Sequence, residues 1–445
     1  MKNHIYKMLI IVFSAGILFS CEDFLEAVPN KGIATADTLE DLEAILNNVG
    51  VFNRTPGIQN VAADDYYLTD AGWISLGRNM TQRAYTRELE HVFEDEALPS
   101  VWTWPYEQVF YANVCLERLH EIIPVSEEQI QKKRQLTGWS KFVRAFSIYH
   151  LAQTFAEQYQ QSEAGSLRGL PLPRVPDVNN YEEVATLEET YDFILSDLAE
   201  ALVDLPATVK YKSQPNKTAA HALLARVYLG MGEFSLATKH SEEALKMHDQ
   251  LLDFNVLQRT ALFPIPLVNE EVIYHAVSLS LWGFERNQEV RIDSVLYQSY
   301  DENDLRRQFY FIQRPSGAIN YRGSFSGDAE LFTGLTVGEL YLIRAECRAR
   351  IGDAQGAMED LNRLLLSRFA TGEFKVLTIQ NETDMLELVL RERRKELVFR
   401  GMRWADIKRG AALDVKLYRE VNGEAFRFNS QDYAFPIPVE EFIHR

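Results

Sequence analysis

The chain has 445 residues, with 46% apolar residues, 25% charged residues and a formal net charge of −18. A chain of this length and apolar content can bury a large core, which excludes an intrinsically disordered protein. The acidic balance disfavours contact with phosphate backbones, so we expect no nucleic-acid partner.

The N-terminus has the pattern of a lipoprotein signal. Lys2 and Lys7 precede an apolar run over residues 8–19, and a small residue stands before Cys21. The run is shorter than the roughly 20 residues that a membrane-spanning helix needs. We therefore expect residues 1–20 to be a signal peptide and Cys21 to be lipidated as the first residue of the mature protein. The alternative is an ordinary cleaved signal in which Cys21 has no role.

Helical periodicity dominates the rest of the chain, which predicts a mainly α body. It is clearest over residues 100–205 and 338–409, whereas the stretches before and between them are rich in loop-forming residues. One short helix is expected over residues 39–47, within the first of these stretches. The expected divisions of the mature chain are an N-terminal loop-rich segment (residues 21–99), a helical region (100–250), a loop-rich insertion (251–337) and a C-terminal region (338–445).

Two segments have the residue spacing that is typical of tetratricopeptide helix pairs. They lie at residues 220–245 and 339–365, and Gly232 and Gly352 occupy the tight turn between the two helices of each pair. The insertion separates them, so they are not a tandem array. More divergent helix pairs upstream would complete a tetratricopeptide-like scaffold, and a generic helical core is the alternative there.

The insertion is predicted to carry short strands and loops. Alternating residues over 271–277 indicate a strand, and Gly283 places Trp282 and Phe284 in a loop. Loops on a rigid helical frame commonly form binding sites. We therefore expect a ligand at one or both of the loop-rich regions.

No catalytic motif is complete in this sequence. His120-Glu121 begins a zinc-protease pattern, but Pro124 stands where the second histidine is required. Glu392 and Glu396 could pass for a glycosidase pair, yet the basic residues between them predict helical ion pairs with lowered carboxylate pKa values. We expect no catalytic residue, metal site or cofactor, although a glycosidase could still draw carboxylates from distant loops.

The longest motif lies near the C-terminus. Residues 391–409 read RERRKELVFRGMRWADIKR, which resembles the C-terminal signature of the SusD/RagB family of surface nutrient-binding lipoproteins. The pattern predicts a helix that stops at Gly401 and a second helical turn with Arg403, Trp404 and Asp406, an element of architecture more than of ligand binding. Further blocks resemble the family in the same order: CEDFLE at 21–26, FVRA at 142–145, GLPLP at 169–173, EETYDFILSDL at 188–198, EEVIY at 270–274 and FPIP at 435–438.

The resemblance implies a SusD-like lipoprotein on the outer face of the outer membrane, acting as a lid on a SusC-like, TonB-dependent barrel. In that role it would capture an oligosaccharide and pass it to the transporter. Glu22 and Asp23 are similar to the acidic export signal of such surface lipoproteins. Relatives of the RagB type handle peptides, so a peptide ligand is the alternative.

An oligosaccharide presents C–H faces and hydroxyl groups, so its receptor needs aromatic rings beside amide or guanidinium donors. Both loop-rich regions supply these residue types. One cluster comprises Asp64, Asp65, Tyr66, Tyr67, Trp73, Arg78 and Asn79, and the other comprises Trp282, Phe284, Arg286 and Asn287. For each aromatic residue, a place in the core beneath the loops is the alternative. A surface hydrolase and a pure tetratricopeptide scaffold are further alternatives, but the lipid signal and long insertions favour nutrient capture.

Overall fold

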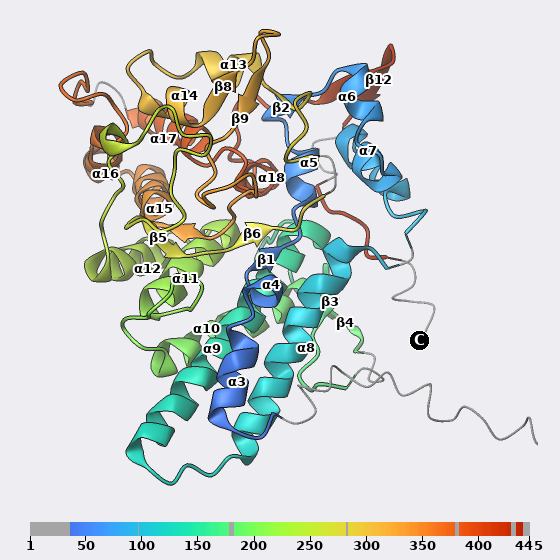
Figure 1. Ribbon diagram of the computed structural model, residues 1–445, viewed down its shortest axis with the longest axis vertical. Helices are drawn as coiled ribbons and strands as arrows, with labels where there is room; N and C mark the ends of the chain where they lie inside the picture. Colours follow the sequence, from blue (N-terminus) through green and yellow to red (C-terminus); the bar gives the residue numbers. More distant parts are fainter. Residues whose placement is uncertain are drawn as a thin grey trace, which may run out of the picture.

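The computed structural model describes residues 36–96, 98–177, 182–281, 284–378, 382–428 and 433–438, so Cys21 and the signal lie outside the described residues. In these ranges the chain is mainly helical, as predicted, with small two-stranded sheets between the helices. Long helices form one end of the molecule, and short strands and helices gather at the other (Figure 1). Within the same ranges, no helix combines the length and the apolar character needed to cross a bilayer.

The N-terminal segment contains more helix than predicted. The expected helix is α3 (Leu39–Leu46), which begins with a capping box between Thr38 and Asp41. Further short helices follow where the sequence predicts loops and short strands: α4 (Val49–Phe52), α5 (Ile58–Ala62), α6 (Asp70–Ile74), α7 (Asn79–Thr86) and the 3-10 turn η1 (Leu89–His91). The prediction was wrong here because such short helices show too few periods to stand out in the sequence.

Three long helices form the first layer of the body: α8 (Ser100–Glu121), α9 (Glu127–Phe155) and α10 (Leu187–Asp204). Arg144 on α9 joins all three. Its guanidinium bonds the Asp197 carboxylate on α10 at 2.7 Å and the Asn113 amide oxygen on α8 at 2.6 Å. Between α9 and α10 the chain forms an antiparallel hairpin of β3 (Arg168–Pro171) and β4 (Val184–Thr186), which helical periodicity does not reveal.

Both predicted tetratricopeptide-like pairs are present. The first is α11 (Lys217–Met231) with α12 (Phe234–Met247), and the second is α15 (Val337–Arg350) with α16 (Ala354–Leu366). Gly232 and Gly352 make the turns at φ of 80° and 89°, a left-handed conformation that glycine adopts without strain. Because α12 packs against α15, the two pairs stack although the insertion separates them in sequence (Figure 1).

The insertion pairs with the N-terminal segment at two places. β1 (Arg54–Thr55) runs parallel to β6 (Val277–Ser278), and β2 (Tyr66–Tyr67) runs antiparallel to β7 (Arg291–Ile292). The insertion also contains the hairpin of β8 (Phe311–Gln313) and β9 (Ile319–Tyr321). Its other elements are η2 (Phe254–Val256), β5 (Val272–Tyr274), α13 (Ser294–Gln298), α14 (Leu305–Phe309) and β10 (Leu335–Thr336), which pairs with β5. These pairings bring the two loop-rich regions to the same end of the molecule (Figure 1).

The C-terminal motif forms α17 (Glu382–Glu396), a turn, and α18 (Met402–Lys408). Gly401 precedes α18 at a φ of 74°, close to the predicted break between the two helices. Arg403 bonds Asp64 at 2.6 Å and Trp404 is buried, so the motif fastens the C-terminal region to the N-terminal segment. A hairpin of β11 (Tyr418–Val421) and β12 (Glu424–Arg427) follows.

Glu392 and Glu396 form ion pairs, as predicted, but their main partners come from outside their own helix. Arg306 bonds Glu392 at 2.6 Å and Glu396 at 3.1 Å, and Arg368 bonds Glu396 at 2.8 Å. Burial alone would raise the pKa of each carboxylate, but the guanidinium groups outweigh it and lower the pKa of Glu396 to about 2. Carboxylates held in this way stay ionised and are unsuited to act as a general acid.

Candidate functional site

The two predicted clusters meet where β2 pairs with β7. Nδ2 of Asn287 donates to Oγ of Ser75 at 3.0 Å, across 212 residues of sequence. The rings of Tyr66 and Phe284 meet edge to face, with centroids 5.1 Å apart. The first loop-rich segment and the insertion therefore share one surface.

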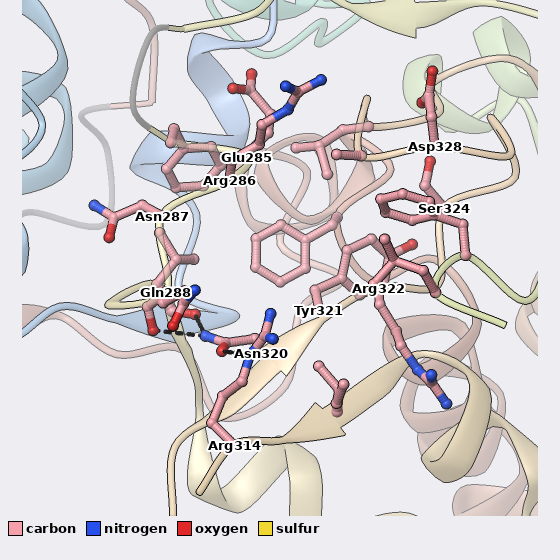
Figure 2. A pocket seen from close by; sticks show the side chains of 18 residues that line it. Glu285, Arg286, Asn287, Gln288, Arg314, Asn320, Tyr321, Arg322, Ser324 and Asp328 are labelled. Carbon is pink, nitrogen blue, oxygen red and sulfur yellow. Dashed lines mark hydrogen bonds between the residues drawn. The ribbon is translucent and has the colours of Figure 1, made fainter. Parts of the chain in front are cut away.

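A cavity of about 420 Å³ opens beside this junction. We call it the hairpin pocket, because the β8–β9 hairpin forms one of its walls (Figure 2). Its apolar and aromatic lining comprises Leu262, Phe263, Phe284, Val290, Ile312, Tyr321, Ala329, Leu331 and Phe399. Its polar lining comprises Glu285, Arg286, Asn287, Gln288, Arg314, Asn320, Arg322, Ser324 and Asp328. The pocket thus combines an apolar floor with a rim rich in amide and guanidinium groups.

A second hollow, of about 600 Å³, adjoins the hairpin pocket. The two share Glu285, Arg286 and Ala329, and residues 75–77 also line the second hollow. The two hollows therefore adjoin at these three shared residues.

The aromatic floor of the hairpin pocket is mostly covered. Phe284 is 2% exposed and Phe399 is 4% exposed, whereas Tyr321 and Phe263 are partly exposed. Tyr321 stacks on Phe399 with ring centroids 4.9 Å apart and an interplanar angle of 29°. Phe399 lies in the turn between α17 and α18 at a φ of 56°, which is rare for a bulky residue. The C-terminal motif therefore contributes to the pocket as well as to the architecture.

Asn320 fixes the rim of the pocket. Its Nδ2 donates to the backbone oxygens of Gln288 at 2.8 Å and Val290 at 2.9 Å. Its Oδ1 accepts from Nε of Arg314 at 2.9 Å, which orients that arginine (Figure 2). These bonds hold β9 against the segment before β7.

Two acidic residues line the hairpin pocket, and both serve the loop backbone. The Glu285 carboxylate accepts from the backbone N–H of Leu281 at 2.9 Å, and burial raises its pKa. The Asp328 carboxylate accepts from the backbone N–H of Glu330 at 2.8 Å. Neither carboxylate forms an ion pair with an arginine of the rim within the described ranges.

Three of the sequence-predicted residues line the hairpin pocket: Phe284, Arg286 and Asn287. Arg286 is exposed and also borders the second hollow. The Asn287 amide points away from the pocket and bonds Ser75 there, so this residue positions the loop (Figure 2). Tyr66 lies buried behind Phe284, and its hydroxyl donates to the backbone oxygen of Val61 at 2.6 Å.

Other candidates lie outside the lining of the pocket. Tyr67 is exposed on β2 and pairs there with Arg291. Trp73 is half-buried, and its Nε1 donates to the backbone oxygen of Gln82 at 3.3 Å. Trp282 lies outside the described residues.

Arg78 and Asn79 secure the start of α7. Nδ2 of Asn79 donates to Asp95 at 2.7 Å, and the Arg78 guanidinium approaches Glu96 at 3.9 Å. Both side chains are exposed but neither lines the hairpin pocket or the second hollow. Their contacts stabilise the fold next to the site.

Asp64 and Asp65 are buried, contrary to their expected place on a ligand face. Asp64 pairs with Arg403 at 2.6 Å, and Asp65 pairs with Arg394 at 3.2 Å. Both arginines belong to the C-terminal motif. The two aspartates therefore hold the fold together and are not accessible to a ligand.

Most residues that line the pocket are not among the candidates selected from the sequence. The missing residues include Gln288, Arg314, Asn320, Tyr321, Arg322 and Phe399. One signal in the sequence is Gly317, which lies between Arg314 and Arg322. It forms the turn of the hairpin with a φ of 84°. A prediction of that hairpin would have placed Arg314 next to its turn and Arg322 at its other end, opposite Tyr310.

The hairpin pocket has the chemistry of a binding site. Among the residues that the structure describes, no histidine, cysteine or lysine lines it, and Oγ of Ser324 is engaged with Oγ of Ser326 at 2.8 Å. Across the described ranges, no group of three or more histidine, cysteine, aspartate or glutamate side chains is placed to hold a metal ion. The arrangement provides hydrogen-bond donors and apolar contact without a nucleophile paired to a base.

Two family models match the chain. Residues 23–229 match a family described as starch-binding and associating with the outer membrane, and residues 297–441 match the SusD family. The second range contains the β8–β9 hairpin and Phe399 of the hairpin pocket.

Individual proteins of this family are similar to the chain in sequence or in structure. SusD-like protein P2 of Formosa agariphila is 26% identical over 412 residues, which cover 77% of this chain and 77% of that protein. A SusD superfamily protein of Bacteroides fragilis has the same fold, with a TM-score of 0.72, 20% identity and coverage of 93% of this chain and 99% of that chain. A laminarin-binding SusD-like protein has a TM-score of 0.61 and 19% identity, over 91% of this chain and 96% of that chain. The chain belongs to the SusD/RagB family, whose members are binding proteins associated with the outer membrane.

Proposed function

We propose that this protein captures oligosaccharides in the hairpin pocket and delivers them to an outer-membrane transporter. The observation that carries the proposal is the convergence of free amide and guanidinium donors, from Gln288 and Arg314, beside the partly exposed Tyr321 ring. Sugar hydroxyls accept from such donors, and the C–H face of a sugar packs on an aromatic ring. The laminarin-binding protein of the same fold supports a glycan as the ligand class.

A peptide is the alternative ligand within this family. Extended peptides commonly bind by adding a strand to an open sheet edge. At the hairpin pocket, the Asn320 side chain occupies the backbone oxygens of Gln288 and Val290, so these oxygens are not free to pair with an added strand. This favours a glycan over a peptide that would pair with residues 288–290.

We expect soluble protein that begins at Glu22 to bind one class of glycan in a calorimetric screen of glycans and oligopeptides. Gln288→Ala and Tyr321→Ala should each weaken that binding about tenfold or more, because each removes a direct contact worth roughly 1–3 kcal/mol in a desolvated pocket. The Gln288 side chain is exposed and has no hydrogen bond within the described ranges, so its removal should leave folding unchanged.

Gln250→Ala and Tyr211→Ala are matched controls. Both side chains are exposed and lie outside the hairpin pocket and the second hollow. Wild-type binding by these controls, with loss in the pocket variants, would support the proposal. Unchanged binding by Gln288→Ala and Tyr321→Ala would place the ligand elsewhere, and binding of peptides without glycans would favour the alternative.

We further propose that Cys21 carries the lipid anchor and that the protein acts as a lid on a SusC-like, TonB-dependent barrel. The signal pattern and the outer-membrane association of the family support this. In cells fed a palmitate analogue, the wild type should be labelled, be cleaved by protease added to intact cells, and co-purify with such a barrel. Cys21→Ser should lose the label, whereas Cys115→Ser, at a buried free cysteine, should keep it. A labelled Cys21→Ser variant would contradict the anchor.

A further inference from the structure

Three arginines line the hairpin pocket without an acidic partner in the ranges that the structure describes: Arg286, Arg314 and Arg322. Two arginines in the core, by contrast, have acidic partners. Arg306 and Arg368 each contact at least two carboxylates. The chain has a formal net charge of −18, so acidic side chains are abundant, yet none of those that the structure describes forms an ion pair with an arginine of this rim.

Arg314 and Arg322 flank the β8–β9 hairpin and are held by uncharged groups. Arg314 bonds the Asn320 amide oxygen through Nε, which leaves its other N–H donors without a partner in the described residues. The Arg322 guanidinium donates to the backbone oxygens of Gln308 at 2.8 Å and Ala261 at 3.0 Å. These bonds fix both side chains at the pocket without cancelling either charge.

Of these two arginines, Arg314 keeps N–H donors that are free within the described residues, because the Arg322 guanidinium points toward the backbone oxygens that it bonds (Figure 2). Burial and the positive charge of Arg314 lower the pKa of Arg322. An anionic group of a ligand beside Arg314 would balance this positive charge. The guanidinium fork of Arg314 matches the geometry of carboxylate and sulfate oxygens.

The acidic residues of the pocket do not supply this anion. Glu285 and Asp328 are engaged with the loop backbone through Leu281 and Glu330. Figure 2 places both of them on the side of the pocket opposite Arg314. The positive end of the pocket is therefore open to a negative group on a ligand.

We propose that the oligosaccharide bound in the hairpin pocket is anionic, and that Arg314 binds a carboxylate or sulfate group on it. This inference rests on the proposed oligosaccharide capture. The covered rings of Phe284 and Phe399 offer little surface for sugar stacking, so stacking falls to the partly exposed Tyr321 and the guanidinium groups supply the charged contacts. Arg286, which borders both hollows, is placed to bind a second anionic group further along the chain of the glycan.

The test is calorimetry with paired probes of equal length. One pair is an oligogalacturonate and its carboxyl-reduced form, and the other is a sulfated galactan oligosaccharide and its desulfated form. An oligoglutamate serves as the acidic peptide probe. We expect one charged glycan to bind about tenfold or more tightly than its neutral counterpart, and to weaken as salt is added. The charged glycan that binds distinguishes a carboxylate from a sulfate ligand.

Substitutions of Arg314 test whether the preference for charged glycans arises in the hairpin pocket. Arg314→Gln should remove most of the difference between charged and neutral glycans, and Arg314→Lys should restore part of it, because lysine keeps the charge without the planar fork. Arg391→Gln removes the same charge from an exposed site on α17, where the arginine pairs with Glu387, and should bind like the wild type.

The outcomes separate this inference from the proposed function. Equal binding of a charged glycan and its neutral counterpart would overturn the anionic ligand and leave oligosaccharide capture standing. A selectivity that Arg314→Gln and Arg391→Gln both retain would overturn the assignment to this pocket. Binding of oligoglutamate alone, or of no probe, would overturn oligosaccharide capture itself.

Discussion

We expect Arg368→Met to lower the free energy of unfolding by about 3–5 kcal/mol, because removing one partner of a buried ion pair leaves uncompensated charge in the core. Arg368 is fully buried and bonds Glu271 at 2.7 Å and Glu396 at 2.8 Å. Without it, the Glu271 carboxylate would keep only the backbone N–H of Leu252, at 2.9 Å, as a partner in the described residues. Methionine fills a similar volume, so the loss should come mainly from charge. Urea unfolding followed by circular dichroism measures it.

Arg391→Met is the matched control for this substitution. Arg391 lies on the same helix as Glu396, but its side chain is 61% exposed and its partner Glu387 is 48% exposed. An exposed helical pair contributes only about 0.3–0.5 kcal/mol. Similar losses in Arg368→Met and Arg391→Met would show that the buried network does not dominate stability.

The features that sequence reasoning predicts well are local. The two tetratricopeptide-like pairs follow from small residues at fixed spacing and from the turn glycines Gly232 and Gly352, and each signal lies within about one helix pair. The break before α18 follows in the same way from Gly401. Such patterns depend on the chain within a few turns, so they can be recognised without the tertiary structure.

The candidate site is predicted only in part, because its residues meet through long-range pairing. Phe284, Arg286 and Asn287 share one loop and are found together in the sequence. Arg314 comes from the β8–β9 hairpin and Phe399 from the turn before α18, and nothing in their local sequence places them beside that loop. Strand pairing and the packing of the C-terminal motif decide this, and neither is visible in local periodicity.

The charged residues also have long-range partners that the local sequence does not identify. The sequence correctly predicts a lowered pKa for Glu392 and Glu396, but from the basic residues of their own helix. The structure keeps one such partner, Lys395 beside Glu392, and adds Arg306 and Arg368 from 86 and 28 residues away. Likewise, Asp64 is predicted on a ligand face, yet it pairs with Arg403 inside the fold. Residue type indicates that a charge will be paired, and only the fold determines with which partner.

Lowering the pH should decrease the free energy of unfolding of this protein, and Glu346 contributes to the pH range in which this happens. Burial alone would raise the pKa of Glu346, but Arg409, Arg393 and Arg350 outweigh it and lower the pKa to about 2, from 4.5 in the unfolded chain. Arg409 makes two bonds to this carboxylate, at 2.5 and 2.7 Å, and joins α18 to α15. Because the folded pKa is the lower one, the stabilisation is complete above about pH 4.5 and is lost as the pH falls toward 2.

Glu346→Gln isolates this contribution, because glutamine resembles the protonated carboxyl group. At about pH 6 the variant should unfold more easily than the wild type by about 3 kcal/mol, and the difference should shrink as the pH approaches about 2. Glu243→Gln, at an exposed pair with Lys246 on α12, should follow the wild type at every pH. Urea unfolding across this range measures both. If Glu346→Gln instead ran parallel to the wild type down to the lowest pH, the contacts between α15 and α18 would not depend on the charge of Glu346, and the acid sensitivity would belong to other carboxylates such as Glu396.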